Sequence, residues 1–404
     1  MNGKADKIGF VIPWYSEKAP GGAEMELREV VQHLHKRGVP VEILSTCVKD
    51  FSSDWNVNFF HEGMTTVHGD IPIRRFKVRK RDAEAFNSVN LKLMNNIPIS
   101  PEEEDTFFQE MVNSQALYKY ISENSSEYKC FVFIPYMFGT TFFGIQACPQ
   151  KAVVIPCFHN EAYLYIKKAK PVFESTAGMI YNAESEARLA NKTFDLSNTK
   201  QIVMGIGMDQ DISGNAERFR EKFGIRSPYI IYAGRKDSGK NVDALIKYFE
   251  EYIKRRRTDL KLVLIGGGSI DIPERLLRRR DIIDLGFVDR QDKYDAIAGA
   301  QFLCQPSMHE SFSLVIMESW LCGRPVLVNQ YCDVTSDFAA GSKGGLYFKN
   351  YLEFEGCTDF YLRNPAIAEK MGENGGKYVR EKFAWNIIED NYIRFLDEVS
   401  ANNA

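Results

Sequence analysis

Residues 229–255, YIIYAGRKDSGKNVDALIKYFEEYIKR, contain the unit from which the fold is predicted. Residues 229–232 form a short apolar run, which is typical of a strand buried in a parallel sheet. A polar loop follows, and in residues 241–255 the apolar residues recur at helical spacing. A strand, a loop and a helix in this order form the repeating unit of open parallel α/β sheets.

The same alternation continues on both sides of this unit. Apolar runs that predict buried strands lie at residues 8–12, 41–44, 131–134, 152–155, 178–181, 201–204, 262–265, 282–285, 302–305 and 325–328. A chain of 404 residues exceeds what one core usually supports, so two domains are expected. We predict an α/β protein with two Rossmann-like, doubly wound parallel-sheet domains facing a central cleft. The predicted domains are residues 1–207, with a C-terminal helix at about 384–404 packing back on them, and residues 208–383.

The composition is that of an ordinary globular protein, with 44% hydrophobic and 26% charged residues. The formal net charge of −3 argues against nucleic acid as a partner. Eight cysteines occur without a C-x-x-C pair, which favours reduced thiols over disulfides or a zinc site. The N-terminus has no apolar stretch of signal-peptide length, so a cytoplasmic location is expected. The uncharged segment 130–150 is interrupted by proline and glycine, so it predicts a buried strand and helix rather than a membrane span.

Two cations, Arg235 and Lys240, lie on the loop between the strand and the helix of the opening stretch. Ligands of open parallel sheets bind at the carboxyl ends of the strands, which is where this loop lies. Two fixed cations at that edge suit a diphosphate, and a solvated basic loop is the alternative. Gly21 and Gly22 precede a predicted helix whose unpaired N–H groups suit an anion, and a plain turn explains them equally well.

A second charged pattern lies in HESFSLVIMES, residues 309–319. Ser311 or Ser313 could cap a helix, which would leave Glu310 in the preceding loop and Glu318 more than a turn inside. The two carboxylates would then reach different parts of one extended ligand, with the first backbone N–H groups of the helix between them. A surface glutamate is the alternative for Glu318. A metal site is disfavoured, because no histidine pair at ligand spacing accompanies the glutamates.

These residues match a family. The chain resembles, nearly from end to end, the retaining glycosyltransferases of family 4, which have the GT-B fold. Glu310 and Glu318 match that family's E-x7-E motif. The other matching segments are the donor-phosphate loop GRKDSGKNVDALI (234–246), the N-terminal glycine loop GGAE (21–24), the interdomain linker VMGIGMD (203–209) and RPVLV (324–328) after the second glutamate.

The resemblance implies roles for the charged residues. Arg235 and Lys240 would hold the donor diphosphate and stabilise the charge that develops on the leaving nucleotide. Glu318 would bind the ribose hydroxyls. Glu310 would hold the transferred sugar.

The resemblance also assigns neighbouring groups to the donor. The backbone amides of Phe312, Ser313 and Leu314 would assist Glu310, and the loop of Gly21 and Gly22 would approach the donor. His159, in CFHNEAY, matches the family histidine near the sugar ring and the transferred carbon. Residues 182–186, NAESE, match a segment in which the family often has Ser-Glu, with a weaker role.

The chain departs from the family pattern at several positions. Ser311 and Ser313 replace glycines, which would narrow the sugar pocket or add hydroxyls to it. Ile206 stands where the linker usually has asparagine. Lys236 follows Arg235 where a hydrophobic residue is usual. None of these changes removes a charged residue of the predicted site.

The implied mechanism is hexosyl transfer with retention at the anomeric carbon, without a covalent intermediate, a cofactor or a metal. The donor would be a nucleoside-diphosphate sugar, with UDP or GDP favoured as the nucleotide. Arg235 and Lys240 would supply the positive charge that a divalent cation supplies in other sugar transferases. The sequence DQD at 209–211 imitates a metal-binding motif, but it lies in the predicted linker.

The acceptor is expected to be a saccharide or a lipid-linked saccharide in bacterial surface-polysaccharide synthesis, such as O-antigen, capsule or exopolysaccharide. The basic segment IRRFKVRKR, 73–81, could place Arg74 to Arg81 against the cytoplasmic face of the membrane, or could form an exposed edge strand and loop. Two other functions stay open, a sugar-nucleotide epimerase and a non-catalytic subunit that binds nucleotide-sugar.

Overall fold

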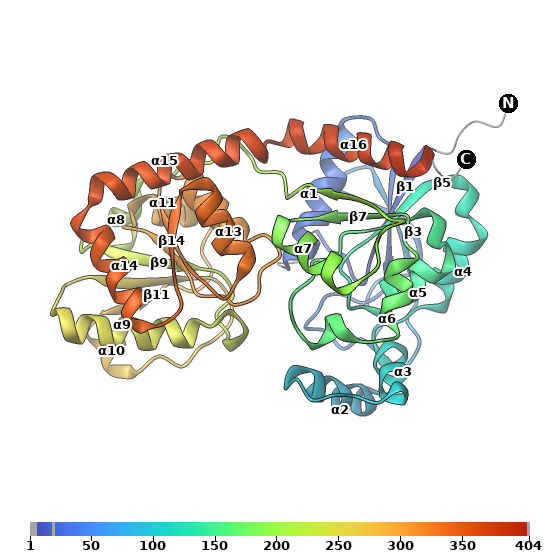
Figure 1. Ribbon diagram of the computed structural model, residues 1–404, viewed down its shortest axis with the longest axis horizontal. Coiled ribbons are helices and arrows are strands. Elements are labelled where there is room, and N and C mark those ends of the chain that lie inside the picture. Colours follow the sequence, from blue (N-terminus) through green and yellow to red (C-terminus); the bar gives the residue numbers. More distant parts are fainter. Residues whose placement is uncertain (1–5, 18–20, 402–404) are drawn as a thin grey trace. The chain divides into compact units, whose positions relative to one another are not determined.

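The computed structural model describes residues 6–17 and 21–401, with Ser238 described without its side chain. The chain divides into two compact units. The first runs to Gly207 and resumes at Trp385, and the second is Met208–Ala384 (Figure 1). Residues 402–404, which belong to the predicted C-terminal helix, lie outside the described residues.

The first unit is built on an eight-stranded sheet of order β3-β4-β2-β1-β5-β6-β7-β8. All neighbouring strands pair in parallel except β3 and β4, which form an antiparallel pair at one edge. The strands are β1 (Lys7–Ile12), β2 (Val41–Thr46), β3 (Gly63–Val67), β4 (Ile71–Phe76), β5 (Tyr128–Phe133), β6 (Ala152–Val154), β7 (Gly178–Tyr181) and β8 (Lys200–Val203). The predicted edge strand at the start of the basic segment is therefore β4, and β3 covers its outer side.

Helices cover this sheet and bury apolar stripes against it. In α1, Leu27, Val30, Val31 and Leu34 are all buried, as their helical spacing predicts. The segment 130–150 forms the buried strand β5 and the helix α5, and no described helix is long and apolar enough to cross a membrane. The helices are α1 (Gly22–Lys36), α2 (Ala83–Met94), α3 (Pro101–Glu110), α4 (Gln115–Glu123), α5 (Gly139–Ala147), α6 (Ala169–Glu174), α7 (Glu184–Thr193) and α16 (Trp385–Ala401).

The C-terminal helix α16 belongs to the first unit and packs along α1 (Figure 1). The His33 ring stacks on Trp385 with 3.7 Å between ring centroids. His33 Nδ1 lies 2.7 Å from a Glu389 oxygen, and Arg37 donates to Glu389 at 2.8 Å. The chain thus returns to its first unit through an aromatic contact supported by ion pairs.

The second unit is a six-stranded sheet of order β11-β10-β9-β12-β13-β14, and every neighbouring pair is parallel. The strands are β9 (Tyr229–Ala233), β10 (Lys261–Ile265), β11 (Ile282–Asp284), β12 (Leu303–Gln305), β13 (Val326–Asn329) and β14 (Gly345–Phe348). The helices are α8 (Ala216–Phe223), α9 (Val242–Arg256), α10 (Glu274–Arg278), α11 (Arg290–Gly299), α12 (Leu314–Leu321), α13 (Asp333–Ser342), α14 (Tyr351–Arg363) and α15 (Pro365–Lys382). Helices lie on both faces of this sheet, as a doubly wound architecture requires.

Trp320 joins α12 to α15 in the core of the second unit. Its side chain is 1% exposed, and its indole N–H donates to the Gly344 carbonyl at 2.9 Å. The helices approach closely at Gly375, where an added Cβ would lie 2.2 Å from the Trp320 ring. A glycine in the middle of α15 is therefore required by packing rather than by backbone conformation.

Gly375→Ala should lower the free energy of unfolding by about 1–3 kcal/mol, because the new methyl group displaces a buried indole. Gly356→Ala is the matched control, since Gly356 lies within α14 and an added Cβ there meets nothing within 4 Å. The control should gain about 0.5–1 kcal/mol from the lower backbone entropy of alanine. Urea unfolding of both variants measures the difference, and equal stabilities would contradict this packing.

Candidate functional site

The order in which strands are added to the second sheet reverses between β9 and β12. After β9 the chain adds β10 and β11 on one side, and then returns to place β12 on the other side of β9. Ligands of open α/β sheets bind at such a switch point, outside the carboxyl ends of the strands. Two loops diverge there, the loop after β9 with Arg235 and Lys240 and the loop after β12 with Glu310.

An ion pair joins the two loops. Lys240 Nζ donates to Glu310 Oε1 at 2.7 Å, and the two side chains are 28% and 11% exposed. Gln305, the last residue of β12, donates to the same oxygen and to Ser313 Oγ, both at 3.3 Å. The structure therefore brings together one cation and one carboxylate of the predicted site at the switch point.

The loop after β9 is ordered by Asp237. The Asp237 carboxylate accepts the Lys240 backbone N–H at 2.9 Å and also pairs with the Arg235 guanidinium. The Arg235 side chain is 64% exposed, and its carbonyl accepts the Tyr232 hydroxyl at 2.6 Å. The arginine thus has a fixed backbone and an accessible charge at the carboxyl edge of the sheet.

The helix α12 begins as predicted but without the predicted cap. Ser313 occupies the position before the helix with φ 73° and ψ 74°, and its side chain does not bond a helix N–H. Because no described side chain caps α12, its first backbone amides remain donors for a ligand. Phe312 is 1% exposed and packs on Phe338 and Phe383, so only its backbone is placed to meet a ligand.

Glu318 is buried and is not a surface helix glutamate, since only 8% of the residue is exposed. Lys293 Nζ donates to Glu318 Oε1 at 2.5 Å, and the Tyr294 hydroxyl lies 3.4 Å from the same oxygen. Sequence reasoning missed Lys293 and Tyr294, because they come from α11 and only the fold brings them to Glu318. All the contacts found for this carboxylate within the described residues fall on Oε1, and Oε2 is left for an external donor.

His159, Gly21 and Gly22 belong to the first unit. His159 follows β6, and its Nδ1 lies 3.3 Å from Glu161 Oε1, which accepts the Tyr136 hydroxyl at 3.0 Å. Gly21 precedes α1, where an added Cβ would collide with the Glu24 carboxylate at 1.9 Å. The negative group beside the N-terminus of α1 is therefore the chain's own Glu24, and donor binding by the two glycines stays a prediction.

Two buried carboxyls support the segment that carries His159. Glu186 accepts the backbone N–H groups of Phe158 and Asn182, both at 2.7 Å. Glu26 accepts the Asn182 side-chain amide at 3.0 Å. Burial raises the pKa of Glu26 and of Glu186 to about 8. The Glu186 side chain therefore holds the loop of His159 by accepting the backbone N–H of Phe158.

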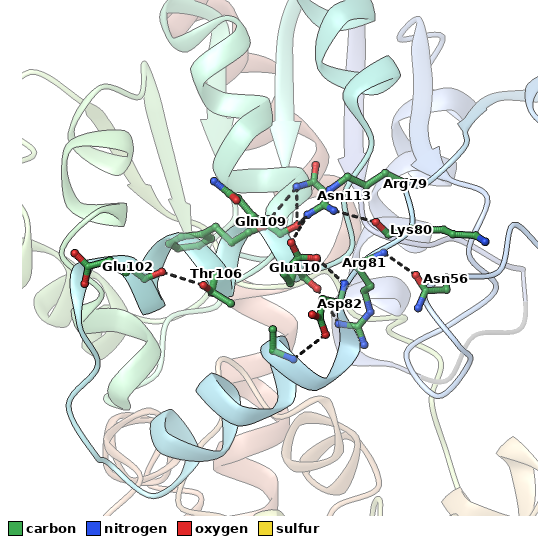
Figure 2. A network of polar contacts seen from close by, with 12 residues as sticks. Asn56, Arg79, Lys80, Arg81, Asp82, Glu102, Thr106, Gln109, Glu110 and Asn113 are labelled. Carbon is green, nitrogen blue, oxygen red and sulfur yellow. Dashed lines mark hydrogen bonds and ion pairs between the residues drawn. The ribbon is translucent and has the colours of Figure 1, made fainter.

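The basic segment is largely committed to internal contacts. Figure 2 shows Arg79 and Arg81 directed at Glu110, the last residue of α3. Arg79 lies 3.1 Å from a Glu110 carboxylate oxygen, and Arg81 donates to the Glu110 carbonyl at 2.9 Å. Arg74 pairs with the buried Glu42 at 2.9 Å. These arginines fasten β4 and the α2–α3 hairpin to the first unit, so the exposed cations of the segment are its lysines.

The Asp209 of the DQD sequence is also committed, since it pairs with Arg290 at 2.9 Å. Among the described residues no group of three or more His, Cys, Asp or Glu side chains is arranged to hold a metal ion.

Comparisons with known proteins agree with this geometry. Residues 215–378 match the family model of the glycosyl transferases group 1. The D-inositol 3-phosphate glycosyltransferase of Gordonia bronchialis is 25% identical over 267 residues, which are 60% of this chain and 58% of that protein. A 4-alpha-N-acetylgalactosaminyltransferase of Campylobacter jejuni, named for a diphospho-undecaprenol-linked acceptor, is 29% identical over 126 residues, 30% of this chain and 33% of that protein. The chain spans about half the length of the curated relatives that it matches.

The likeness in structure extends over the whole chain. The Anabaena protein HepE, solved in complex with UDP and glucose, aligns with a TM-score of 0.69 and 15% identity over 97% of this chain and 99% of that one. Such a likeness shows the fold, which is the predicted GT-B fold of two parallel-sheet α/β domains. The family match covers most of the unit that carries Arg235, Lys240, Glu310 and Glu318. The chain therefore has the GT-B fold, and its second unit is similar to the glycosyl transferases group 1.

The buried Glu26 predicts how stability depends on pH. Its carboxyl is protonated in the folded chain up to pH of about 8 and is ionised in the unfolded chain above its ordinary pKa of 4.5. The folded state therefore holds a proton that unfolding releases, and the free energy of unfolding falls as pH rises between these values. The slope for one such group reaches about 1.4 kcal/mol per pH unit.

Glu26→Gln should reduce the slope by about 1.4 kcal/mol per pH unit, because an amide does not titrate, and should leave the part that Glu186 contributes. Urea unfolding at several pH values between about 5 and 8 measures it. Glu184→Gln is the control, since Glu184 is an exposed glutamate on α7 beside the same segment. A Glu26→Gln slope equal to that of the wild type would show that this carboxyl is ionised in the folded chain.

Proposed function

We propose that the chain is a glycosyltransferase that moves a hexose-type sugar from a nucleoside-diphosphate sugar to a hydroxyl of a saccharide or lipid-linked acceptor. The observation that carries the proposal is the Lys240–Glu310 pair at the switch point of the second sheet. A cation that suits a phosphate and a carboxylate that suits sugar hydroxyls lie in contact there. Arg235 and the uncapped N-terminus of α12 flank them.

The donor would lie along this edge in an order set by chemistry. Arg235 and Lys240 suit the two phosphates, since charge-assisted hydrogen bonds to phosphate oxygens are strong. Glu310 and the first amides of α12 suit the sugar hydroxyls. Glu318 suits the two ribose hydroxyls, because Lys293 holds its Oε1 and no described residue pairs with its Oε2.

The proposed reaction proceeds with retention. The bond between the anomeric carbon and the diphosphate oxygen breaks, and the acceptor oxygen bonds to the same carbon on the same face. The acceptor proton passes to the leaving diphosphate. Arg235 and Lys240 stabilise the negative charge that develops on the leaving group, which is the electrostatic contribution that usually dominates such steps. No side chain forms a covalent bond, and these two cations serve in place of a metal.

The proposals for the acceptor and the pathway rest on the first unit and on the name of one relative. The first unit would bind the acceptor, with His159 near the transferred carbon. The Campylobacter relative is named for a lipid-linked acceptor, which favours such an acceptor here and with it a role in bacterial surface-polysaccharide synthesis. Contact with the membrane would fall to Lys77 and Lys80, because they are the exposed cations of the segment, although Lys77 also lies 3.5 Å from a Glu62 carboxylate oxygen.

Two other functions would use the same donor site. An epimerase would convert the nucleotide-sugar without an acceptor, and a binding subunit would hold it unchanged. Incubation of the isolated chain with a nucleotide-sugar and an acceptor separates the three. Transfer releases a nucleoside diphosphate, epimerisation gives an isomeric nucleotide-sugar, and a binding subunit gives neither product.

Lys240→Ala should lower the rate of nucleoside diphosphate release by about 10²–10³-fold, because the leaving diphosphate loses a stabilising cation. Lys247→Ala is the matched control, since Lys247 lies on α9 with a side chain that is 77% exposed. The control should keep its activity, and both variants should unfold at wild-type temperatures. A Lys240→Ala enzyme with wild-type turnover would remove this lysine from the mechanism.

Metal dependence gives a separate prediction. Addition of a chelator should leave transfer largely intact, because Arg235 and Lys240 carry the positive charge. The rate of nucleoside diphosphate release is compared before and after chelation. Full loss of activity that magnesium restores would contradict the metal-independent mechanism.

A further inference from the structure

Lys236, the residue after Arg235, is a buried cation. It is 3% exposed, and lysine is rarely buried unless it is paired. Its Nζ donates to Asp284 Oδ1 at 2.5 Å. Asp284 ends β11, two strands away from β9, so the pair spans the loops after both strands. The charge of Lys236 is directed at this aspartate, in contrast to the exposed charge of Arg235.

Backbone contacts lock together the three loops that the pair spans. The Lys236 N–H donates to the Gly267 carbonyl at 2.8 Å. The Gly266 N–H donates to the Gly286 carbonyl at 2.8 Å. Gly266 has φ 129°, and an added Cβ would lie 2.0 Å from the Gly234 carbonyl oxygen. The loops after β9, β10 and β11 therefore approach too closely to move independently.

Asp284 connects the pair to an exposed aromatic residue. The same oxygen, Asp284 Oδ1, accepts the Gly286 N–H at 2.9 Å, and Gly286 turns the chain with φ 64°. The next residue, Phe287, is 82% exposed. A large aromatic ring is thus presented at the carboxyl edge of the sheet on a backbone that Asp284 fixes. Lys236 in turn fixes Asp284.

We propose that the Lys236–Asp284 ion pair is a positioning element that holds residues 286–288 where the nucleoside end of the donor packs beside Phe287. This inference rests on the proposed function, because it assumes that a nucleoside diphosphate lies along this edge. Lys236 acts as a positioning residue, because its ammonium group is paired with Asp284 and does not contact a donor phosphate. Arg235 and Lys240 hold the diphosphate without it.

The two ends of the ligand can be tested separately. Lys236→Met keeps the length and apolar stem of the side chain and removes its charge. The variant should bind its preferred nucleoside diphosphate about tenfold more weakly, measured by titration calorimetry with UDP, GDP, ADP and dTDP. Its affinity for inorganic pyrophosphate should stay that of the wild type. A structural defect of the whole loop would weaken both ligands together.

Lys222→Met is the matched control, because Lys222 also pairs with an aspartate of the second unit, Asp292, at 2.7 Å. It should bind both ligands as the wild type does. Lys236→Met/Asp284→Asn guards against misfolding, since removal of both partners avoids an uncompensated charge. The asparagine retains an acceptor for the Gly286 N–H. This double variant should be as stable as the wild type and should still lose nucleoside affinity.

Amide hydrogen exchange measures directly, and without a ligand, how firmly the backbone of the loop after β11 is held. The Gly286 amide should exchange faster in Lys236→Met than in the wild type or in Lys222→Met. Unchanged exchange, or equal loss of nucleotide and pyrophosphate affinity, would overturn the inference and leave the proposed function standing. A wild-type chain that binds neither ligand would overturn both.

Discussion

The candidate site depends on one topological constraint, the reversal of strand order between β9 and β12. Parallel strands carry their loops at one edge, and adjacent loops diverge only where the chain has crossed to the other side of the sheet. At this point Lys240 from one loop meets Glu310 from the other, although the two residues are 70 positions apart. The chemistry proposed for the chain follows from what these two loops bring together.

The charged side chains of the candidate site are paired with one another. Four ion pairs lie along the carboxyl edge of the second sheet or beside it: Lys240–Glu310, Lys293–Glu318, Arg235–Asp237 and Lys236–Asp284. The cations of these pairs differ in solvent exposure, and this difference separates a ligand-binding role from a structural one. The exposed Arg235 can turn to a ligand at little cost, whereas the buried Lys236 would leave an uncompensated charge behind. An exposed cation and a buried cation therefore lie next to each other in the sequence.

Much of this arrangement was predictable from sequence, because buried parallel strands are continuous apolar runs. Five of the six strands of the second sheet, the loop position of Arg235 and the helical position of Glu318 follow from that pattern. The sixth strand, β14, was missed, because GLYF at 345–348 is only partly buried. The strand β3 was missed, since GMTTV at 63–67 is mostly exposed and is not an apolar run. Its partner β4 was read from a charge pattern whose arginines are in fact paired internally.

The partners that complete the site could not be predicted from the sequence, because they lie far from one another along the chain. Lys293 precedes Glu318 by 25 positions, and Lys236 precedes Asp284 by 48. No local spacing relates such partners, and only the packing of α11 and β11 creates the contacts. Lys236 did leave a trace, as a cation at a position that is usually hydrophobic. A polar residue at an apolar position is a useful sign of a buried partner.

The central claim is that the carboxyl edge of the second sheet binds a nucleoside diphosphate. Thermal unfolding of the wild-type chain with UDP, GDP, ADP and dTDP at millimolar concentration tests it most directly, because a ligand that binds only the folded state raises the unfolding temperature. The account predicts that one nucleotide raises this temperature by about 2–4 °C more than the others. Equal unfolding temperatures with all four and with buffer alone would contradict it.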